Sequence, residues 1–250
     1  MEGPSLRLAA EQLSPLVEEV VQSVSGNTKI DKERLLKKKI LSIFSYGKYL
    51  VLQFDTFALR THFLWFGSFE ATIRRKKVTG DYSKKSQTPR LAFRCKKGHV
   101  ELYSCSVKFI EDANLLENCD FTIDIMADCW DEKRALRQLK KQQRFEIADA
   151  LLDQTIFLGV GNIIKNEVLL QAKILPTRKV KNLSARQLKK IVELTRNYVF
   201  QFYEWRKKFE LRKHYQIYRQ STCKVCGEKV TRKKTGLRNR ISFFCLHCQK

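Results

Sequence analysis

The sequence predicts an α+β chain of several domains, in which a β-rich region, a helical region and a small cysteine-rich segment follow one another. Short β-type runs separated by turn residues extend from about residue 29 to 125. Amphipathic helical patterns follow over 132–214, and two Cys-x-x-Cys pairs lie in the last 30 residues. With 250 residues, 43% of them hydrophobic, the chain can bury real cores, which excludes a disordered protein.

The charge of the chain predicts a polyanionic partner. The sequence has 49 lysines and arginines against 26 aspartates and glutamates, a formal net charge of +23. The stretch from Arg178 to Lys250 alone holds 21 basic residues against four glutamates, so we expect the main electrostatic contact in the C-terminal part. Nucleic acid is the simplest such partner, although ribosomal proteins are basic too.

Composition also predicts a cytoplasmic protein without membrane contact. No stretch approaches the roughly 18 consecutive apolar residues that span a bilayer, and the N-terminus lacks a basic segment followed by an apolar one. Of the eight cysteines, four form the two pairs and four are scattered among apolar or strand-like residues. This usage indicates a reducing compartment and one metal site rather than disulfides.

The first domain, expected over 1–126, begins with a helix over residues 5–24, with Pro4 in its first turn and Pro15 as a point where it can kink or divide. The β-type runs after it are 40–44, 49–54, 58–62, 71–74, 90–93 and 100–105. Such a series is typical of a β-sandwich or a β-barrel. The segment 78–89 has the composition of an exposed loop.

The second domain, expected over 127–217, is predicted to be helical. Its helices are expected over 132–141, 147–152, 163–172, 184–204 and 205–214. Ser184 followed by Gln187 matches a capping box at the start of the fourth helix.

The third domain, expected over 218–250, carries a predicted zinc site. Its ligands are Cys223, Cys226, Cys245 and Cys248, two pairs separated by 18 residues. Four thiolates fill a tetrahedral shell, so we expect one structural Zn²⁺ per chain. Unliganded cysteines, or His247 as a ligand, are the alternatives. The basic stretch 230–244 alternates like two short strands, which suits a hairpin that presents an arginine to a phosphate, or a solvated basic loop.

A glycine turn precedes the helix expected over 163–172. Gly159 and Gly161 let the backbone fold tightly, and Asn162 can cap the helix. Exposed N–H groups at a helix start attract anions, so this turn is a candidate contact for the DNA backbone. The alternative is a turn that only connects two helices.

Five short motifs occur in order over nearly the whole chain. They are Glu2-Gly3-Pro4, Gly47-Lys48-Tyr49-Leu50, His62-Phe63-Leu64-Trp65-Phe66-Gly67, Leu152-Asp153-Gln154 ahead of Gly159-Val160-Gly161-Asn162, and Arg240-x-Ser-x-Phe-Cys245. Together they resemble the formamidopyrimidine-DNA glycosylase and endonuclease VIII family, and look closest to bacterial endonuclease VIII. The resemblance implies an N-terminal β-sandwich with a flanking helix, a helix-two-turn-helix domain and a zinc-finger hairpin, which clasp damaged DNA.

The resemblance implies catalytic roles for the first two residues. The family's chain begins with a proline whose amine is the nucleophile; here Met1 stands in that place. A glutamate in second position hinders removal of the initiator methionine, so we expect Met1 to be retained and its amine to form an imine with C1′ of the damaged nucleotide. Glu2 matches the family's general acid and base.

Further roles are implied in the β-rich domain. Lys48 matches a lysine that contacts phosphate and donates a proton in β-elimination, and His62 matches a histidine that contacts phosphate. Leu64, Trp65 and Phe66 match the loop that fills the hole left by the everted nucleotide. The alternatives are a surface charge for Lys48, a satisfied core partner for His62 and strand core for 64–66.

In the C-terminal part, Gly161 and Asn162 match the turn and the asparagine that contact the DNA backbone. Arg240 matches the finger arginine that reaches the phosphates beside the lesion and is linked to the second, δ, elimination.

These roles predict a monomeric base-excision repair glycosylase with AP lyase activity, acting on double-stranded damaged DNA at the bacterial nucleoid. The opening Glu2-Gly3-Pro4 and the bulky residues 64–66 look more like endonuclease VIII, and this resemblance implies oxidised pyrimidines such as thymine glycol and dihydrouracil as substrates. Because position 1 departs from the family, a catalytically silent protein that binds damaged DNA or abasic sites is the alternative. A basic zinc-ribbon translation or transcription factor would explain the charge and the cysteines, but not the N-terminal motifs.

Overall fold

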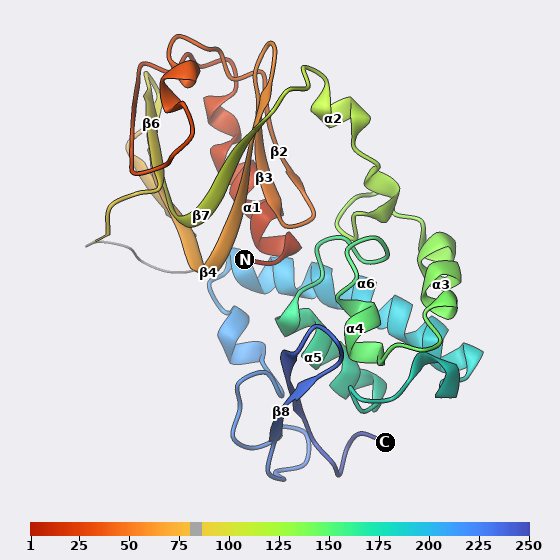
Figure 1. Cartoon of the computed structure of the whole chain (residues 1–250). Helices are drawn as coiled ribbons and strands as arrows, with labels where there is room; N and C mark the ends of the chain where they lie inside the picture. The colour runs from red at the N-terminus through yellow and green to blue at the C-terminus, as the bar shows by residue number, and fades with distance from the viewer. Residues whose placement is uncertain (81–86) are drawn as a thin grey trace. The chain divides into compact units, whose positions relative to one another are not determined.

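The computed structural model describes residues 1–80 and 87–250 (Figure 1). Their contacts divide the chain into two compact units, Met1–Asp120 and Phe121–Lys250. The domain bounds expected from the sequence, 1–126, 127–217 and 218–250, stay predictions. Of the loop expected over 78–89, residues 81–86 lie outside the described residues. No helix in the described ranges is both long enough and apolar enough to cross a bilayer.

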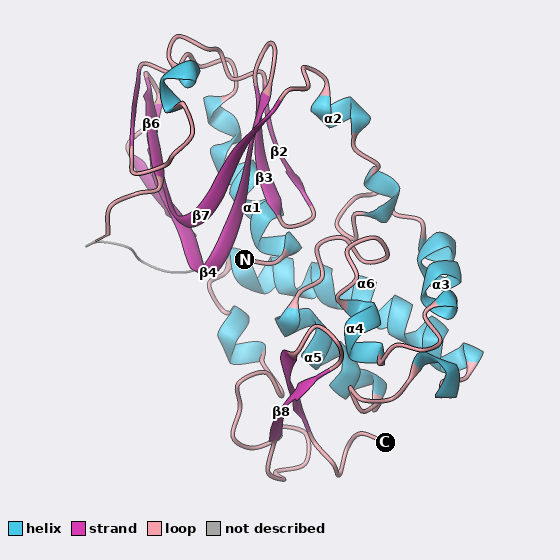
Figure 2. Cartoon of the chain, viewed as in Figure 1, coloured by secondary structure: helices cyan, strands magenta, loops and turns pink. Residues whose placement is uncertain are grey.

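The first unit is a β-sandwich with a helix against it (Figure 2). Its strands are β1 (Ser23–Ser25), β2 (Ser42–Tyr46), β3 (Tyr49–Gln53), β4 (Ala58–Ile73), β5 (Lys76–Thr79), β6 (Leu91–Cys95) and β7 (Gly98–Ile110). They follow the order β1-β6-β7-β4-β3-β2, and β5 pairs with β4. The first half of β4 pairs with β3 and its second half with β5, so the two long strands β4 and β7 run through both layers. Of the two folds that the sequence predicted, the first unit is therefore the β-sandwich.

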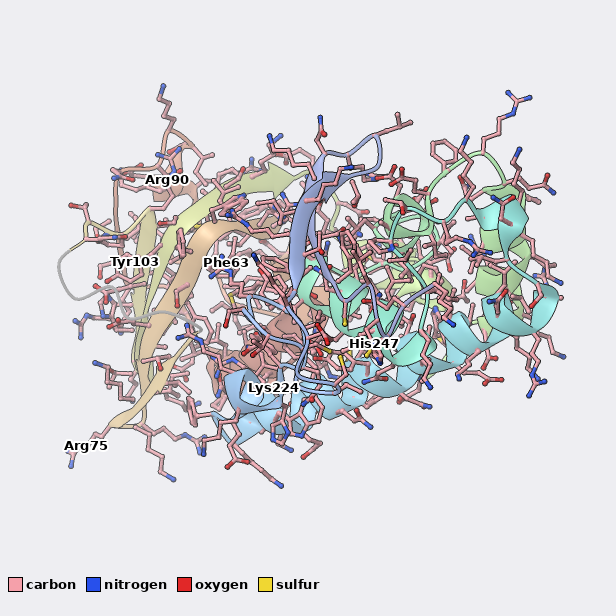
Figure 3. All side chains as sticks on the ribbon, turned by 90° about the horizontal axis from the view of Figure 1, so that it is seen from below. Phe63, Arg75, Arg90, Tyr103, Lys224 and His247 are labelled. Atoms are coloured by element: carbon pink, nitrogen blue, oxygen red, sulfur yellow. The ribbon has the colours of Figure 1, made fainter. Side chains whose placement is uncertain are left out.

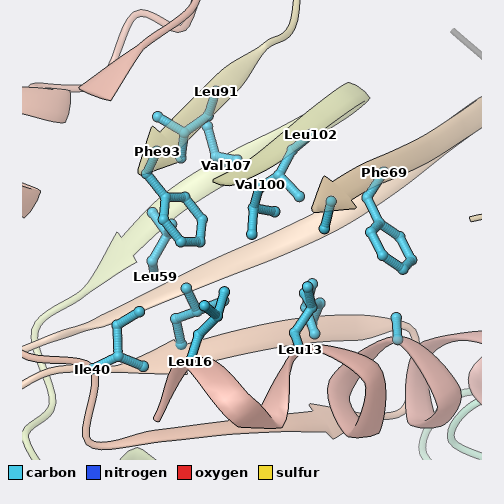
Figure 4. Packing of buried hydrophobic residues seen from close by; sticks show 14 of the residues in the cluster. Leu13, Leu16, Ile40, Leu59, Phe69, Leu91, Phe93, Val100, Leu102 and Val107 are labelled. Carbon is cyan, nitrogen blue, oxygen red and sulfur yellow. The ribbon is translucent and has the colours of Figure 1, made fainter. Parts of the chain in front are cut away.

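Helix α1 (Gly3–Leu13) packs on this sheet and closes its core. Figure 4 shows Leu13 and Leu16 facing side chains from several strands, among them Leu59 and Phe93. All four are almost fully buried. Burial of each such side chain stabilises the fold by about 1.5–3 kcal/mol. The apolar side of the first helix therefore contributes to the core of the first unit.

The helix expected over residues 5–24 was too long. The α-helix ends at Leu13, and a 3-10 helix, Ser14–Leu16, follows it. Pro15 has no N–H to continue the helical ladder, so the chain leaves the helix there. After Glu18, in the left-handed region at φ 68°, the backbone pairs with the stretch before β2: Glu18 N donates to Ile40 O (2.8 Å) and Val21 N to Lys38 O (3.0 Å).

The second unit is mainly helical and ends with a two-stranded hairpin. Its helices and strands are α3 (Glu132–Lys141), α4 (Ile147–Leu151), α5 (Asn162–Ala172), α6 (Ala185–Lys207), β8 (Thr231–Thr235) and β9 (Arg240–Phe244); the short α2 (Leu115–Asn118) belongs to the first unit. One buried hydrophobic cluster surrounds α5 and α6. A smaller cluster joins Leu170 of α5 to the cysteine-rich segment 218–250, called the finger below. The helix expected over 205–214 is instead the end of α6 and a 3-10 helix, Leu211–His214.

The start of α6 carries the capping box that the sequence predicted. Ser184 Oγ accepts a hydrogen bond from Gln187 N (3.2 Å), and Gln187 Oε1 accepts one from Ser184 N (2.9 Å). Two N–H groups at the helix start are thereby satisfied.

We therefore expect Ser184→Ala to lower the free energy of unfolding of the C-terminal unit by about 1 kcal/mol, because one helix N–H loses its acceptor. Urea unfolding followed by circular dichroism measures this. Gln201→Ala, a change at an exposed position of the same helix, should cost less than about 0.5 kcal/mol. Equal losses in the two variants would contradict a specific role for the cap.

Candidate active site and nucleic-acid interface

Lys48 and His62 lie side by side in the first unit. Gly47, at φ 55°, turns the chain between β2 and β3 and sets Lys48 in the turn directly before β3. Tyr49 is the partner of His62 in the β3–β4 register, and the rings of these two residues lie 5.4 Å apart. His62 Nδ1 is 3.2 Å from Lys48 O, a hydrogen bond that orients the imidazole.

Several positive groups surround His62. Burial of the ring lowers its pKa from the ordinary value, while the hydrogen bond to the Lys48 carbonyl opposes the shift. The N-terminal ammonium, Lys48 and Arg60 are near enough to lower the pKa further. The chain's amine, Lys48, Arg60 and His62 therefore form one cluster, a suitable environment for phosphate groups.

Glu2 lies at the positive end of α1. It is the N-cap residue, and its carbonyl accepts hydrogen bonds from Ser5 N (2.9 Å) and Leu6 N (3.2 Å). Glu2 is 8% exposed, and Met1 packs partly against the hydrophobic core. The first two residues are therefore held by the helix rather than frayed, with a carboxyl group directly beside the amine's residue.

Leu64, Trp65 and Phe66 form an exposed apolar loop within β4, called the wedge below. Their exposed fractions are 52%, 64% and 50%. The β4–β7 register shifts between Phe63 and Ser68, so these residues bulge from the sheet instead of pairing. A Cβ on Gly67 would lie 2.6 Å from Ser104 O, so only glycine fits where the bulge ends. The wedge is surface, and the strand-core alternative is wrong.

In the second unit, the side chain of Gln154 holds the glycine turn. Its Oε1 accepts from Gly159 N (3.2 Å), and its Nε2 donates to Val160 O (3.0 Å) and Leu152 O (2.9 Å). Gly159 adopts φ 105°, a conformation that favours glycine. The turn therefore enters α5 with a defined shape.

Asn162 does not cap α5, contrary to expectation. Gly161 is the N-cap residue, with extended backbone, and Asn162 is already the first helical residue. Its Nδ2 donates instead to Ile241 O of the finger (2.9 Å), while its Oδ1 is buried without a hydrogen-bond partner among the described residues. The asparagine thus joins the turn to β9, the strand that begins with Arg240.

Three consecutive polar residues of α5, which the sequence analysis missed, are buried. Lys165 Nζ donates to Ser242 Oγ (2.8 Å), and Asn166 Oδ1 accepts from Phe243 N (2.9 Å). Glu167 accepts backbone N–H groups of residues 216–218, at 2.8–3.1 Å. Burial raises the pKa of Glu167, and these N–H donors oppose the shift. The only signal in the sequence was an uninterrupted polar run in an otherwise apolar helix.

The four predicted cysteines come together. Cys223 Sγ lies 4.0 Å from Cys248 Sγ, and Cys226 Sγ lies 3.5 Å from Cys245 Sγ. All four sulfurs lie within 4.8 Å of one another, and His247 is exposed outside this group. Four sulfurs at about 2.3 Å from a tetrahedral ion are about 3.8 Å apart, so the set fits a metal ion.

Asp149 of α4 anchors the tip of the finger hairpin. Its carboxylate accepts from Leu237 N (2.6 Å) and Arg238 N (3.2 Å). A Cβ on Gly236, at φ 66°, would lie 2.3 Å from that carboxylate. Thr235 and Arg240 close the β8–β9 ladder on either side of the tip, so the basic stretch is an anchored hairpin with Arg240 exposed beside its tip.

Residues 123–201 match the family model described as formamidopyrimidine-DNA glycosylase H2TH domain. Endonuclease 8-like 3 of Xenopus laevis is 33% identical over 207 residues, 82% of this chain and 33% of that protein. Endonuclease 8-like 3 of Homo sapiens is 29% identical over 254 residues, 100% of this chain and 41% of that protein. The chain thus spans a third to two fifths of the length of these relatives.

Solved structures share the fold over the whole chain. A viral DNA glycosylase superposes with a TM-score of 0.83 at 23% identity, covering 100% of both chains. The Lactococcus lactis formamidopyrimidine-DNA glycosylase, solved non-covalently bound to DNA with an AP site, gives 0.82 at 20% identity, again over 100% of both chains. The solved structures show the shared fold, while the match over residues 123–201 and the relatives named endonuclease 8-like confirm the resemblance in sequence. The chain belongs to the formamidopyrimidine-DNA glycosylase and endonuclease VIII family.

Proposed function

We propose that this chain is a base-excision repair DNA glycosylase with AP lyase activity that acts on oxidised bases, pyrimidines by preference, in double-stranded DNA. The N-terminal cluster carries the proposal: Glu2 lies beside the residue whose amine would react, and Lys48 and His62 lie near that amine. The relatives named endonuclease 8-like, and a structural relative bound to AP-site DNA, support it. We propose a monomer; the bacterial nucleoid as its location stays a prediction.

The chemistry begins with the unprotonated amine of Met1. It attacks C1′ of the everted nucleotide, the C1′–N bond breaks, and the base leaves with a proton supplied by Glu2. The amine then loses a proton, the C1′–O4′ bond breaks as the C1′=N bond forms, and O4′ takes up a proton, which opens the sugar ring and yields an imine. The imine acidifies the C2′ hydrogens, so a base can remove one and expel the 3′ phosphate. Lys48 and His62 hold the phosphates in place during these steps.

The remaining contacts complete the DNA clasp. The wedge fills the space of the everted nucleotide, because its exposed apolar side chains replace lost base stacking. Asn162, beside the glycine turn, contacts the DNA backbone. Arg240 reaches the phosphates beside the lesion and assists the second elimination. One Zn²⁺ held by the four cysteines stabilises the hairpin that presents Arg240.

A catalytically silent protein that binds damaged DNA or abasic sites is the second candidate. Met1 stands where the family has its proline nucleophile, and this departure favours a silent binder. Only an imine can be reduced to a covalent complex, so chemical trapping separates the two functions.

We expect borohydride to trap the protein on an abasic-site duplex and on a thymine-glycol duplex, with the adduct on the Met1 amine. Glu2→Gln should reduce base release by at least about 100-fold, because the amide cannot transfer the proton, and should leave lesion binding nearly unchanged. Intact mass, the N-terminal peptide and an anisotropy titration give these three readouts. No adduct on either duplex would refute the lyase, and parallel loss of binding and release in Glu2→Gln would indicate misfolding.

Removal of the metal should unfold the hairpin, because metal binding and folding are coupled in such small segments. We expect a chelator to release one zinc per chain and to weaken DNA binding at least about tenfold, and added zinc to restore it. Elemental analysis and anisotropy measure both. A metal-free protein that binds DNA as tightly as before would refute the structural role of zinc. Arg240→Ala, which leaves the cysteines intact, should weaken binding and keep the zinc.

A further inference from the structure

Five exposed cations of the C-terminal unit lie outside the glycine turn at 159–162. They are Arg144, Lys179, Lys181, Arg186 and Arg238, called the basic track below. The first follows α3, the next two lie between α5 and α6, the fourth is in the first turn of α6, and the last is in the hairpin tip. None of the motifs that carry the family resemblance includes them.

Backbone pairing brings the first three together. Ile147 N donates to Arg178 O (2.8 Å), Val180 N to Phe145 O (3.0 Å), and Lys181 N to Gln143 O (3.2 Å). Glu146 and Lys179 form the antiparallel bridge at the centre of this pairing. Segments that are more than 30 residues apart in the chain therefore place Arg144 beside Lys179 and Lys181.

Asp149 joins the hairpin tip to this region. It follows Glu146 by three residues, one turn of α4 or about 4.5 Å of rise, and its carboxylate holds Leu237 N and Arg238 N. The track therefore continues from the hairpin that carries Arg240, past the start of α4, to the start of α6.

The cations of the track form no ion pairs within the described parts of the chain, although Glu146 lies between them with one carboxylate oxygen buried. The carboxylate of Asp149 is buried and already accepts two N–H groups. The first turn of α6 has no acidic residue, so Arg186 adds positive charge at the positive end of a helix, an unfavourable position unless an anion approaches.

We propose that the basic track binds the phosphate backbone of DNA beyond the nucleotide being repaired, so that the chain needs a long stretch of DNA for full affinity. This rests on the proposed function, since it extends the same DNA contact. A phosphate backbone fits better than an acidic peptide, because the cations form a row continuous with the hairpin of Arg240 and a backbone presents charge at regular intervals.

The experiment compares the wild-type chain with the triple variant R144Q/K179Q/K181Q. Binding to duplexes of about 8 and about 30 base pairs, each with a central abasic-site analogue, is measured by anisotropy at several salt concentrations. On the long duplex, the slope of log K against log salt is negative, and we expect its magnitude to fall by about 2.7 for three lost phosphate contacts, with at least tenfold weaker binding at low salt. On the short duplex, both quantities should stay within about twofold of wild type.

A matched control removes three positive charges elsewhere. R75Q/K76Q/K96Q changes exposed residues at the β4–β5 and β6–β7 turns, about ten residues along β4 from the wedge; Figure 3 labels Arg75 at this end of the sheet. It should leave the salt slope on the long duplex unchanged. If the magnitude of the salt slope fell equally in the control, the effect would come from net charge, and the proposed role of the basic track would be wrong.

The outcomes separate this inference from the proposed function. If the wild-type chain binds the abasic duplex and the track variant keeps its salt slope, the track is wrong and the glycosylase stands; an acidic protein would then be the remaining partner for these residues. If the wild-type chain binds neither duplex, both proposals fail. Should the triple variant unfold, the single variants K179Q and K181Q must each lower the magnitude of the slope by about 0.9.

Discussion

The C-terminal unit depends on three consecutive buried polar residues of α5, Lys165, Asn166 and Glu167. Lys165 and Asn166 bind the strand β9, and Glu167 binds the backbone that leads into the first cysteine pair. Each buried group that lost its partner would cost about 1–3 kcal/mol. These contacts therefore hold the finger where Asp149 can fix its tip, and they couple the glycine turn, the metal site and Arg240 into one rigid piece. A finger with so small an apolar core needs such an anchor.

In the N-terminal unit, the corresponding constraint is the length of β4. Because this strand serves both layers of the sandwich, it must bend, and the bend is where its pairing with β7 shifts. Ser104 on the facing strand adopts φ 47°, and Gly67 touches that strand too closely for a side chain. The residues left over at the bend form the wedge, while His62, before the bend, stays in register with Tyr49. The folded sandwich thus exposes the wedge at the bend and holds His62 in the regular strand directly before it.

Features that depend on residues close together in the sequence were predictable. The cysteine spacing, the capping box at Ser184 and the bounds of α3 were confirmed. The first helix was predicted too long because valines of an extended segment mimic a helical stripe beyond Pro15. Asn162 was expected to satisfy its own helix, yet a distant strand competes for its amide. The buried polar residues of α5 were missed because their hydrogen-bond partners lie about 50–80 residues away in the sequence.

Burial of His62 shows how the first unit limits the density of its own positive charge. Its lowered pKa means that the folded chain takes up the imidazole proton only at a lower pH than the unfolded chain. At neutral pH the ring is therefore neutral, and Lys48 and Arg60 supply the positive charge beside it. As pH falls below the ordinary histidine pKa of about 6.5, the unfolded chain binds more protons than the folded one, so stability is lost in that range. Because the Lys48 carbonyl can only accept, Nδ1 carries the proton of the neutral ring and Nε2 is left as an acceptor. The ring can therefore donate to a phosphate only after it takes up a second proton, which an approaching phosphate would favour.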